Sequence, residues 1–495
     1  MERIESKKKS ISSSFSWKLL ERFFSVGVSI IIQIVLARIV STTDFGSLAL
    51  LVAIINFASI FVSSGISTAI IQKKELEQDD ISTTMTMCMF VALLVYLVLF
   101  FLAPIFADYY ETPELKWGLR VLSIIIFFNS FNSIQIALLS RKMNFKTIFI
   151  RSAIAVPLSG AIGIILALNG FGIWALIIHT LSTSFLTVLI MAIGSKERIG
   201  LRFSFSRAKK IYSFSGFILF AALIAGLRDT FRSLIIGKKY SKEELAFYNK
   251  GYTYSTYVAQ IGKESVSSVL LPAFSTEQSN YDRLLEMGRK SFRLITFVSL
   301  PLLVGFALVS YEFVHIVLTD KWINAVPFLC LFFILRLFDL IKSIYIQMYF
   351  AVGKSKLYFV FSSIVSLVDI GLVFVALNLG SIYIAGAAVI VEAISTIVAF
   401  IISGILFKYS FVERIKDCYK PLIACTVMIG LVLVFNLLEI DNCWITLFSK
   451  IGIGAVSYIG IELLLRDGNI KDCLAIIKRL LKKKEQSNDA EVQEG

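Results

Sequence analysis

Charged residues are scarce in this chain of 495 residues. They make up 17% of the sequence, whereas hydrophobic residues make up 57%, and there are only seven prolines. This composition excludes an ordinary soluble domain, in which about a quarter of the residues are charged. Long apolar stretches with few charges are typical of helices that cross a membrane. The composition therefore predicts an all-α polytopic membrane protein.

The sequence also lacks the motifs and the room that an enzyme needs. It has two histidines and no phosphate-binding glycine loop, HExxH motif or nucleophile elbow. Its longest expected loops, near 108–117, 196–210 and 275–290, are too short for a catalytic domain. Six cysteines are scattered without the spacing of metal ligands or disulfides. We therefore expect no enzyme, no catalytic residue, no metal and no cofactor.

Length and hydropathy predict about fourteen spans, since a helix needs about 20 residues to cross the membrane. The predicted spans are 15–38, 45–70, 83–107, 118–140, 150–168, 172–194, 212–237, 244–274, 293–317, 324–352, 356–379, 382–407, 418–439 and 444–466. The eighth is unusually polar, with Lys250, Lys263 and Glu264. We retain it because its deletion would place the last three basic loops outside, against the positive-inside rule. Both termini are then cytoplasmic.

Two short segments recur at an offset typical of a duplicated block. The Ser-Ile-x-Ile segment at 133–136 returns at 343–346, and Ala-Leu-Asn-Gly at 167–170 returns as Ala-Leu-Asn-Leu-Gly at 376–380. Six spans in each copy give both copies the same orientation in the membrane, as in transporters that rock two lobes about a central site. The predicted parts are an N-terminal lobe (1–196, spans one to six), a C-terminal lobe (197–410, spans seven to twelve), spans thirteen and fourteen (411–466) and a cytoplasmic tail (467–495).

The net charge of +14 does not indicate nucleic acid as a partner. Most of the basic residues fall in the predicted cytoplasmic loops, where they set the topology and meet anionic membrane lipids. No soluble domain carries a basic patch interleaved with aromatics. The tail at 469–484 has an apolar face opposite its lysines, which predicts an amphipathic helix on the inner leaflet, followed by a disordered end at 485–495.

Charges inside the predicted spans are the best candidates for function. Each cation at the bilayer centre costs about 2.5–3.5 kcal/mol, so these cations must face water or a partner. Arg228 and Arg232 stand four residues apart and share one helix face, and the repeat makes their span equivalent to the span of Arg22. We predict a cationic lumen that holds an anion, because guanidinium stays charged and matches phosphate bidentately. The predicted lining residues are Arg22, Arg228, Arg232, Lys250, Lys263 and Arg336.

The same charges allow another interpretation. Glu21 and Asp229 adjoin arginines, and Arg336 with Asp339 is an i, i+3 pair, so some of them could be structural ion pairs. Five acids are candidates for carrying a coupled proton or sodium ion, and the sequence does not rank them: Glu21, Asp229, Glu264, Asp339 and Asp369. The tyrosines at 252, 254 and 257 could bind sugars or form an interfacial aromatic belt.

Short motifs along nearly the whole chain resemble those of the Wzx-type polysaccharide transporters, most closely the colanic-acid exporter branch. These motifs lie at 17–22, 36–38, 44–46, 64–65, 69–74, 138–146, 170–176, 235–238, 248–251 and 271–275. The family belongs to the superfamily that also holds multidrug extruders and the lipid II flippase. The resemblance implies a cavity between the lobes, lined by spans one, two, seven and eight. Its cationic residues map onto Arg22, Arg228, Arg232, Lys250 and Lys263, whereas Arg336 rests on the sequence pattern alone.

The resemblance implies a flippase of the bacterial cytoplasmic membrane. Such a protein moves an undecaprenyl-diphosphate-linked oligosaccharide to the outer leaflet for surface polysaccharide synthesis by alternating access. A polysaccharide polymerase and chain-length machinery are the protein partners it implies. The alternative within the superfamily is a multidrug cation extruder, which would need unpaired carboxylates where arginine and lysine predominate here. A polymerase or ligase would need a large outer loop, and none is expected.

Overall fold

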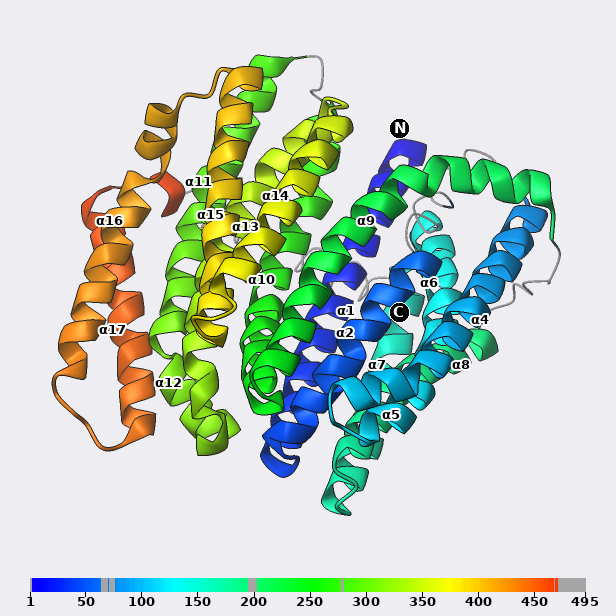
Figure 1. The fold of residues 1–495 in the computed structure, drawn as a ribbon. Helices are drawn as coiled ribbons and strands as arrows, with labels where there is room; N and C mark the ends of the chain where they lie inside the picture. The colour runs from blue at the N-terminus through cyan, green and yellow to red at the C-terminus, as the bar shows by residue number, and fades with distance from the viewer. Residues whose placement is uncertain are drawn as a thin grey trace, which may run out of the picture. The chain divides into compact units, whose positions relative to one another are not determined.

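The computed structural model describes residues 2–63, 70, 76–194, 203–276, 280–466 and 468–470, and in these ranges the chain forms helices and turns without any strand (Figure 1). The helices are α1 (Glu2–Ile39), α2 (Thr42–Ser63), α4 (Gln78–Tyr109), α5 (Glu114–Leu122), α6 (Ile125–Arg141), α7 (Phe145–Leu168), α8 (Ile173–Gly194), α9 (Phe205–Lys239), α10 (Lys242–Thr276), α11 (Tyr281–Leu308), α12 (Ser310–Phe313), α13 (Val326–Ala351), α14 (Ser355–Ala376), α15 (Ser381–Phe407), α16 (Phe411–Asn436) and α17 (Cys443–Leu464), with short π and 3-10 turns at Val314–Leu318 and Asp320–Ala325. The predicted tail beyond residue 470 lies outside the described residues.

Eleven of the described helical segments are long and apolar enough to cross a membrane. Two of the predicted spans, α9 and α10, are helical over 35 residues each but are too polar for that criterion, and α14 contributes a shorter apolar helix at Val360–Ala376. The all-α membrane fold is therefore confirmed, and the count of fourteen spans stays a prediction.

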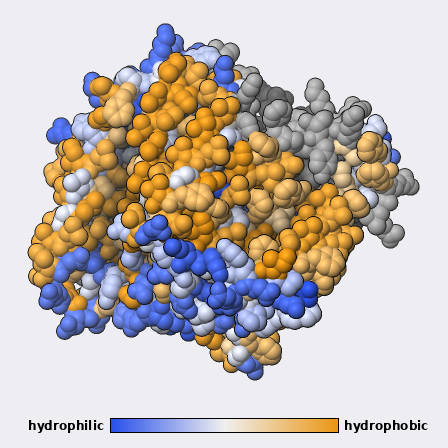
Figure 2. All heavy atoms as spheres, viewed as in Figure 1, coloured by the Kyte–Doolittle hydropathy of each residue, from blue (hydrophilic) through white to orange (hydrophobic). Residues whose placement is uncertain are grey.

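Large apolar side chains cover the outside of the helices. Phe101, Ile165, Ile405 and Val456 are examples from four different helices, and each is more than half exposed. Figure 2 shows apolar residues over broad stretches of the face in view, with hydrophilic residues gathered along its lower edge. Exposed apolar surface on this scale is unfavourable in water but suits helices surrounded by lipid. The chain is a multi-pass membrane protein.

The chain divides into two compact units, and the first comprises Met1–Tyr257 and Phe359–Ala387. In this unit α7 packs against α1 and α8, and α2 packs against α9. The contact between α2 and α9 is close because Gly226 and Gly237 lack side chains. A Cβ added at Gly226 would lie 2.0 Å from the Ile60 Cδ1 atom, and one at Gly237 would lie 2.6 Å from Leu50 Cδ2. Small residues allow helix backbones to approach in this way.

The second unit comprises Val258–Tyr358 and Ala388–Gly495. Here α11 packs against α13 and α16, and α16 packs against α17. Buried aromatic residues from α11, α13 and α15 form much of its core, among them Phe292, Tyr345, Tyr349 and Phe407. The predicted lobes at 1–196 and 197–410 follow the sequence repeat rather than these contact units, and that division stays a prediction.

Candidate functional site

Two arginines and two aspartates form a cluster between α9 and α14, both within the first compact unit. Arg232 of α9 donates a hydrogen bond from its guanidinium to the Asp369 carboxylate of α14. Arg228, one helical turn earlier, places its Nε 3.1 Å from Asp229 Oδ1 and 3.6 Å from Asp369 Oδ2. The spacing of four residues brings both guanidinium groups to one side of α9, as predicted, and Asp369 is the acid that they share.

The cluster is electrically balanced. Two guanidinium groups face two carboxylates, so the formal charges of Arg228, Arg232, Asp229 and Asp369 sum to zero. Burial differs within the cluster: Asp369 is fully buried and Arg232 is 5% exposed, whereas the Asp229 side chain is 47% exposed. Paired charges of opposite sign offset much of the penalty for leaving water. The predicted excess of positive charge is not found within this cluster.

A cavity of about 410 Å³ lies beside the cluster, between α2, α9 and α10. This volume falls within the range of about 300–1,000 Å³ that is usual for small-molecule sites. Its polar lining residues are Asn56, Asp229, Thr230, Ser233, Tyr248, Asn249 and Tyr252. Among the described residues in its wall, Asp229 is the one with a charged side chain. The cavity is thus polar, and its wall carries a carboxylate rather than a guanidinium.

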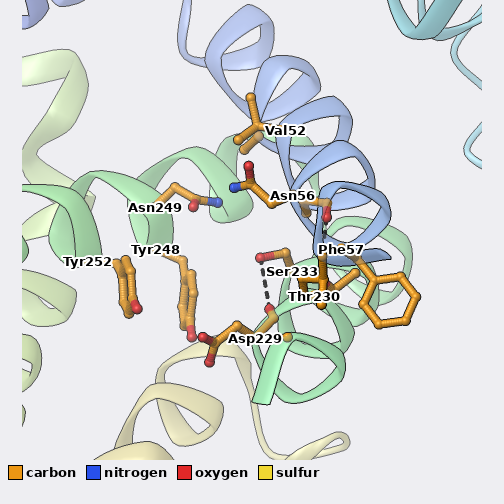
Figure 3. A pocket seen from close by; sticks show the side chains of 13 residues that line it. Val52, Asn56, Phe57, Asp229, Thr230, Ser233, Tyr248, Asn249 and Tyr252 are labelled. Carbon is orange, nitrogen blue, oxygen red and sulfur yellow. Dashed lines mark hydrogen bonds between the residues drawn. The ribbon is translucent and has the colours of Figure 1, made fainter. Parts of the chain in front are cut away.

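Figure 3 shows how these side chains are arranged. The amides of Asn56 and Asn249 point toward one another from α2 and α10, and the hydroxyl end of Tyr248 lies toward the Asp229 carboxylate. The Thr230 hydroxyl donates to the Ala53 carbonyl at 3.2 Å, which joins α9 to α2. Hydrogen-bonding groups from three helices therefore surround one hollow.

Lys250, another predicted lining residue, is packed between helices. Its Nζ donates to the Gln33 Oε1 atom at 3.1 Å and lies 3.8 Å from the centroid of the Phe45 ring. The side chain is 5% exposed. A cation over an aromatic face and beside an amide is well accommodated without an external anion. The structure therefore favours a packing role for Lys250 over direct contact with a ligand, and its predicted binding role stays untested.

Arg22 and Glu21 lie on α1 and are half-buried. Glu21 accepts hydrogen bonds from the Ser25 hydroxyl at 3.1 Å and from the Ser152 hydroxyl of α7 at 3.2 Å. Arg22 lies near Tyr257 of α10. Arg22 therefore belongs to the same compact unit as Arg228 and Arg232, although it is not part of their ion-pair cluster.

The remaining predicted residues are placed differently. Arg336 and Asp339 of α13 belong to the second compact unit, where Arg336 Nη1 lies 3.8 Å from Asp339 Oδ2. This agrees with the i, i+3 ion pair that the sequence left open. The side chains of Lys263 and Glu264 lie outside the described part of the chain.

Some polar residues of the first unit were missed from the sequence. Asn56 stands in the middle of the apolar run of α2, a position where a polar amide signals a hydrogen-bonding role. Arg151, at the start of the predicted span 150–168, is buried in α7, and its Nη1 donates to Asn132 Oδ1 at 2.6 Å. The spacing between Asn132 and Arg151 gave no sign of this contact, which depends on how α6 and α7 pack.

Comparisons with known proteins agree on the family. Residues 35–327, more than half of the chain, match the model of a family described as polysaccharide biosynthesis protein. The chain is 25% identical over 463 residues to the succinoglycan biosynthesis transport protein ExoT of Rhizobium meliloti (strain 1021), covering 91% of this chain and 92% of ExoT. It is 24% identical over 326 residues to the lipopolysaccharide biosynthesis protein WzxC of Escherichia coli (strain K12), covering 65% of this chain and 66% of WzxC.

A solved structure shares the fold. The lipid II flippase MurJ in an inward closed conformation superposes with a TM-score of 0.74, at 18% identity, over 90% of this chain and 98% of MurJ. These findings confirm the resemblance that the sequence motifs indicated. The chain belongs to the polysaccharide biosynthesis protein family, whose relatives include named polysaccharide transport proteins.

Proposed function

We propose that this protein is a flippase that carries undecaprenyl-diphosphate-linked oligosaccharide across the membrane for the synthesis of a surface polysaccharide. It makes and breaks no bond, and it needs no cofactor. Family membership supports the transport of a polysaccharide precursor, and the eleven apolar helices support a membrane location. The observation that carries the proposal is the pair of arginines on α9 that share Asp369 beside a polar cavity.

The proposed mechanism begins with an exchange of anions. In the present state the Asp369 carboxylate contacts both guanidinium groups. A diphosphate offers more negative charge and more oxygens than one carboxylate, and guanidinium binds phosphate oxygens bidentately. The incoming headgroup then takes Arg228 and Arg232 from Asp369, while the polyprenyl chain stays in lipid.

This exchange requires a change at Asp369. A buried carboxylate that loses its partners is destabilised by several kcal/mol unless it is hydrated or takes up a proton. Asp369 and the exposed Asp229 are therefore the acids through which proton or sodium binding would be coupled to transport. The membrane potential supplies a further bias, since two negative charges that move toward a positive exterior release about 4.6 kcal/mol per 100 mV.

The location and the partners follow from the same proposal. The protein would lie in the bacterial cytoplasmic membrane with both termini in the cytoplasm, because the basic loops would then face inward. Its product would be consumed by a polysaccharide polymerase and its chain-length machinery. Membrane lipids would contact the basic loops and the tail.

One observation favours the alternative of a multidrug cation extruder. The charged residue in the cavity wall is the carboxylate of Asp229, which would attract an organic cation. Against it, two arginines lie within 4.0 Å of that carboxylate and offset its charge. The family match also favours a polysaccharide precursor.

The test is a gene deletion followed by rescue. We expect the deletion strain to accumulate lipid-linked oligosaccharide on the cytoplasmic face, where an added periplasmic glycosidase cannot reach it. Rescue by the double variant Arg228→Ala and Arg232→Ala should fail, whereas rescue by Arg120→Ala should succeed. Arg120 is a matched control because its guanidinium lies over the Phe100 ring of α4, 4.2 Å from the ring centroid, and contacts neither Asp229 nor Asp369. Full rescue by the double variant would overturn the role of the arginines. A deletion strain that accumulates no lipid-linked oligosaccharide but loses resistance to organic cations would support the extruder.

A further inference from the structure

We infer that the cavity between α2, α9 and α10 binds an uncharged sugar residue of the transported headgroup, while the diphosphate binds elsewhere. This inference rests on the proposed function and adds that the sugar and the diphosphate occupy separate sites. Asn56, Asn249 and Asp229 are the residues that recognise the sugar hydroxyls. Tyr248 and Tyr252 supply aromatic surface at the side of the hollow.

The chemistry of the wall suits a sugar. An asparagine amide carries both donors and an acceptor, and a carboxylate accepts hydrogen bonds from hydroxyl groups. The Asn249 Nδ2 atom already donates to the Leu245 carbonyl at 3.1 Å, so Asn249 offers its second N–H and its oxygen. Sugar hydroxyls both donate and accept hydrogen bonds, and the faces of a sugar ring are apolar. A sugar therefore matches a cavity that combines amides, a carboxylate and aromatic rings. The two amides point toward one another from α2 and α10, and Asp229 stands on the third helix. A ring placed between them meets hydrogen-bonding groups from several sides.

The position of Asn56 supports a ligand at this site. It lies in the middle of α2, flanked by Ile54, Ile55 and Phe57, and its side chain is exposed to the cavity. Within the described part of the chain, no side chain or backbone group forms a hydrogen bond with its amide. A polar amide within an apolar membrane helix is unfavourable unless it meets water, another helix or a ligand.

The same wall disfavours other occupants. A phosphate would meet no guanidinium among the described lining residues, and the one charged side chain there is the Asp229 carboxylate, which offers a phosphate no hydrogen-bond donor. A metal ion would need several ligands close together, and the described residues contain no group of three histidines, cysteines or acids that could hold one. The volume of about 410 Å³ also far exceeds the space that an ion needs.

Asp229 connects this site to the arginine cluster. Its carboxylate lines the cavity and lies 3.1 Å from Arg228 Nε and 4.0 Å from Arg232 Nη1. A hydroxyl that binds Asp229 would compete with these contacts and leave the arginines more available for an anion. Sugar and diphosphate are therefore expected to bind with positive cooperativity on adjoining sites.

The test compares two ligands on the purified full chain in lipid nanodiscs. One is the lipid-linked oligosaccharide extracted from the deletion strain, and the other is undecaprenyl diphosphate without sugar. Asn56→Leu and Asn249→Leu should each weaken binding of the glycolipid by about tenfold, since each removes hydrogen bonds to the sugar. Both should leave the affinity for undecaprenyl diphosphate unchanged. Asn169→Leu, at the exposed end of α7, is the matched control and should change neither affinity.

The outcomes are distinct. Equal weakening of both ligands would show that the cavity does not recognise sugar, and unchanged affinity for both would show that the amides contact neither ligand. Either result overturns this inference and leaves the flippase proposal standing. Failure of the wild-type chain to bind either lipid would instead overturn the proposed function.

Discussion

Two buried groups of charges in this molecule are built differently. In the α9–α14 cluster, Asp369 is shared by two arginines and adjoins a cavity. In the second unit, Lys450 of α17 and Glu312 of α12 form a closed pair, in which both side chains are about 5% exposed. In a closed pair, each charge has one partner of opposite sign. An acid shared by two cations keeps one partner when the other cation moves away.

The difference separates structural charges from candidate functional ones. Removal of one member of a closed pair leaves an uncompensated buried charge, so the main effect is on stability. Removal of one member of a shared cluster leaves the remaining charges partly matched, so the main effect is on what the cluster can bind. Four substitutions distinguish the two kinds of cluster, and we order them by the size of the change that we expect.

Lys450→Met should have the largest effect on stability. Glu312 would keep its charge in a buried site without its lysine partner, and we expect a loss of about 3–5 kcal/mol. Thermal unfolding in detergent, followed by intrinsic fluorescence, measures it. The double variant Lys450→Met with Glu312→Leu should recover most of the loss, because both charges are then gone. A double variant no more stable than the single one would contradict the assignment as a closed pair.

Arg232→Met should destabilise less and impair transport more. Arg228 remains 3.6 Å from Asp369 and keeps part of the charge match, so we expect a loss of about 1–3 kcal/mol. Export should fall by at least about tenfold, because one of two guanidinium groups for the diphosphate is gone. Unfolding and rescue of the deletion strain are the two measurements. If Arg232→Met lost as much stability as Lys450→Met and the folded fraction still exported, the α9–α14 cluster would be structural like the closed pair.

Gly226→Ala should have a smaller effect through packing alone. The added Cβ would lie 2.0 Å from Ile60 Cδ1, the flexible end of a side chain, so Ile60 can move at a cost of about 1–2 kcal/mol. Gly27→Ala in α1 is the matched control, since nothing lies within 4 Å of its Cβ position. That change should stabilise the helix by about 0.5–1 kcal/mol. Equal results for the two variants would argue against close packing of α2 on α9.

Thr43→Ala should have the smallest effect, and one that depends on pH. The Thr43 hydroxyl donates to the Glu243 carboxylate in the first turn of α10, and this hydrogen bond lowers the pKa of Glu243. A lowered pKa gives stability that is present above the unfolded value, about 4.3, and is lost as pH falls through the folded value. We expect a loss of under about 1 kcal/mol at pH 7 and none at pH 3, because the contact is exposed. An equal loss at both pH values would contradict the charged hydrogen bond.

Much of the fold followed from the sequence. The polar segment that the distribution of lysine and arginine retained as a span forms a helix, α10, at Lys242–Thr276, and that this helix crosses the membrane stays a prediction. Gly170 and Gly380, equivalent in the predicted repeat, both have positive φ just after a helix ends. Local chemistry determined these features, so a single sequence could reveal them.

The site was predicted less completely. The spacing of Arg228 and Arg232 predicted a shared face, but their common partner Asp369 lies 137 residues from Arg232. Arg232 and Asp369 meet only because α9 and α14 pack together, and no local sequence pattern predicts that contact. Lys250 shows the converse, because its charge in a predicted span indicated a lining residue although the side chain packs against Phe45. Burial and partner choice are tertiary properties, which explains why the sequence indicated the residue types but not the partners that each side chain contacts.

The central claim is that Asp369 competes with the substrate diphosphate for the same two arginines. Binding of undecaprenyl diphosphate to Asp369→Asn in nanodiscs tests it most directly, with Glu392→Gln as the control, since Glu392 pairs with Lys342 in the second unit. We expect Asp369→Asn to bind the diphosphate about tenfold more tightly than the wild type, because the competing negative charge is gone. Glu392→Gln should leave the affinity unchanged. Weaker or unchanged binding by a folded Asp369→Asn variant would contradict it.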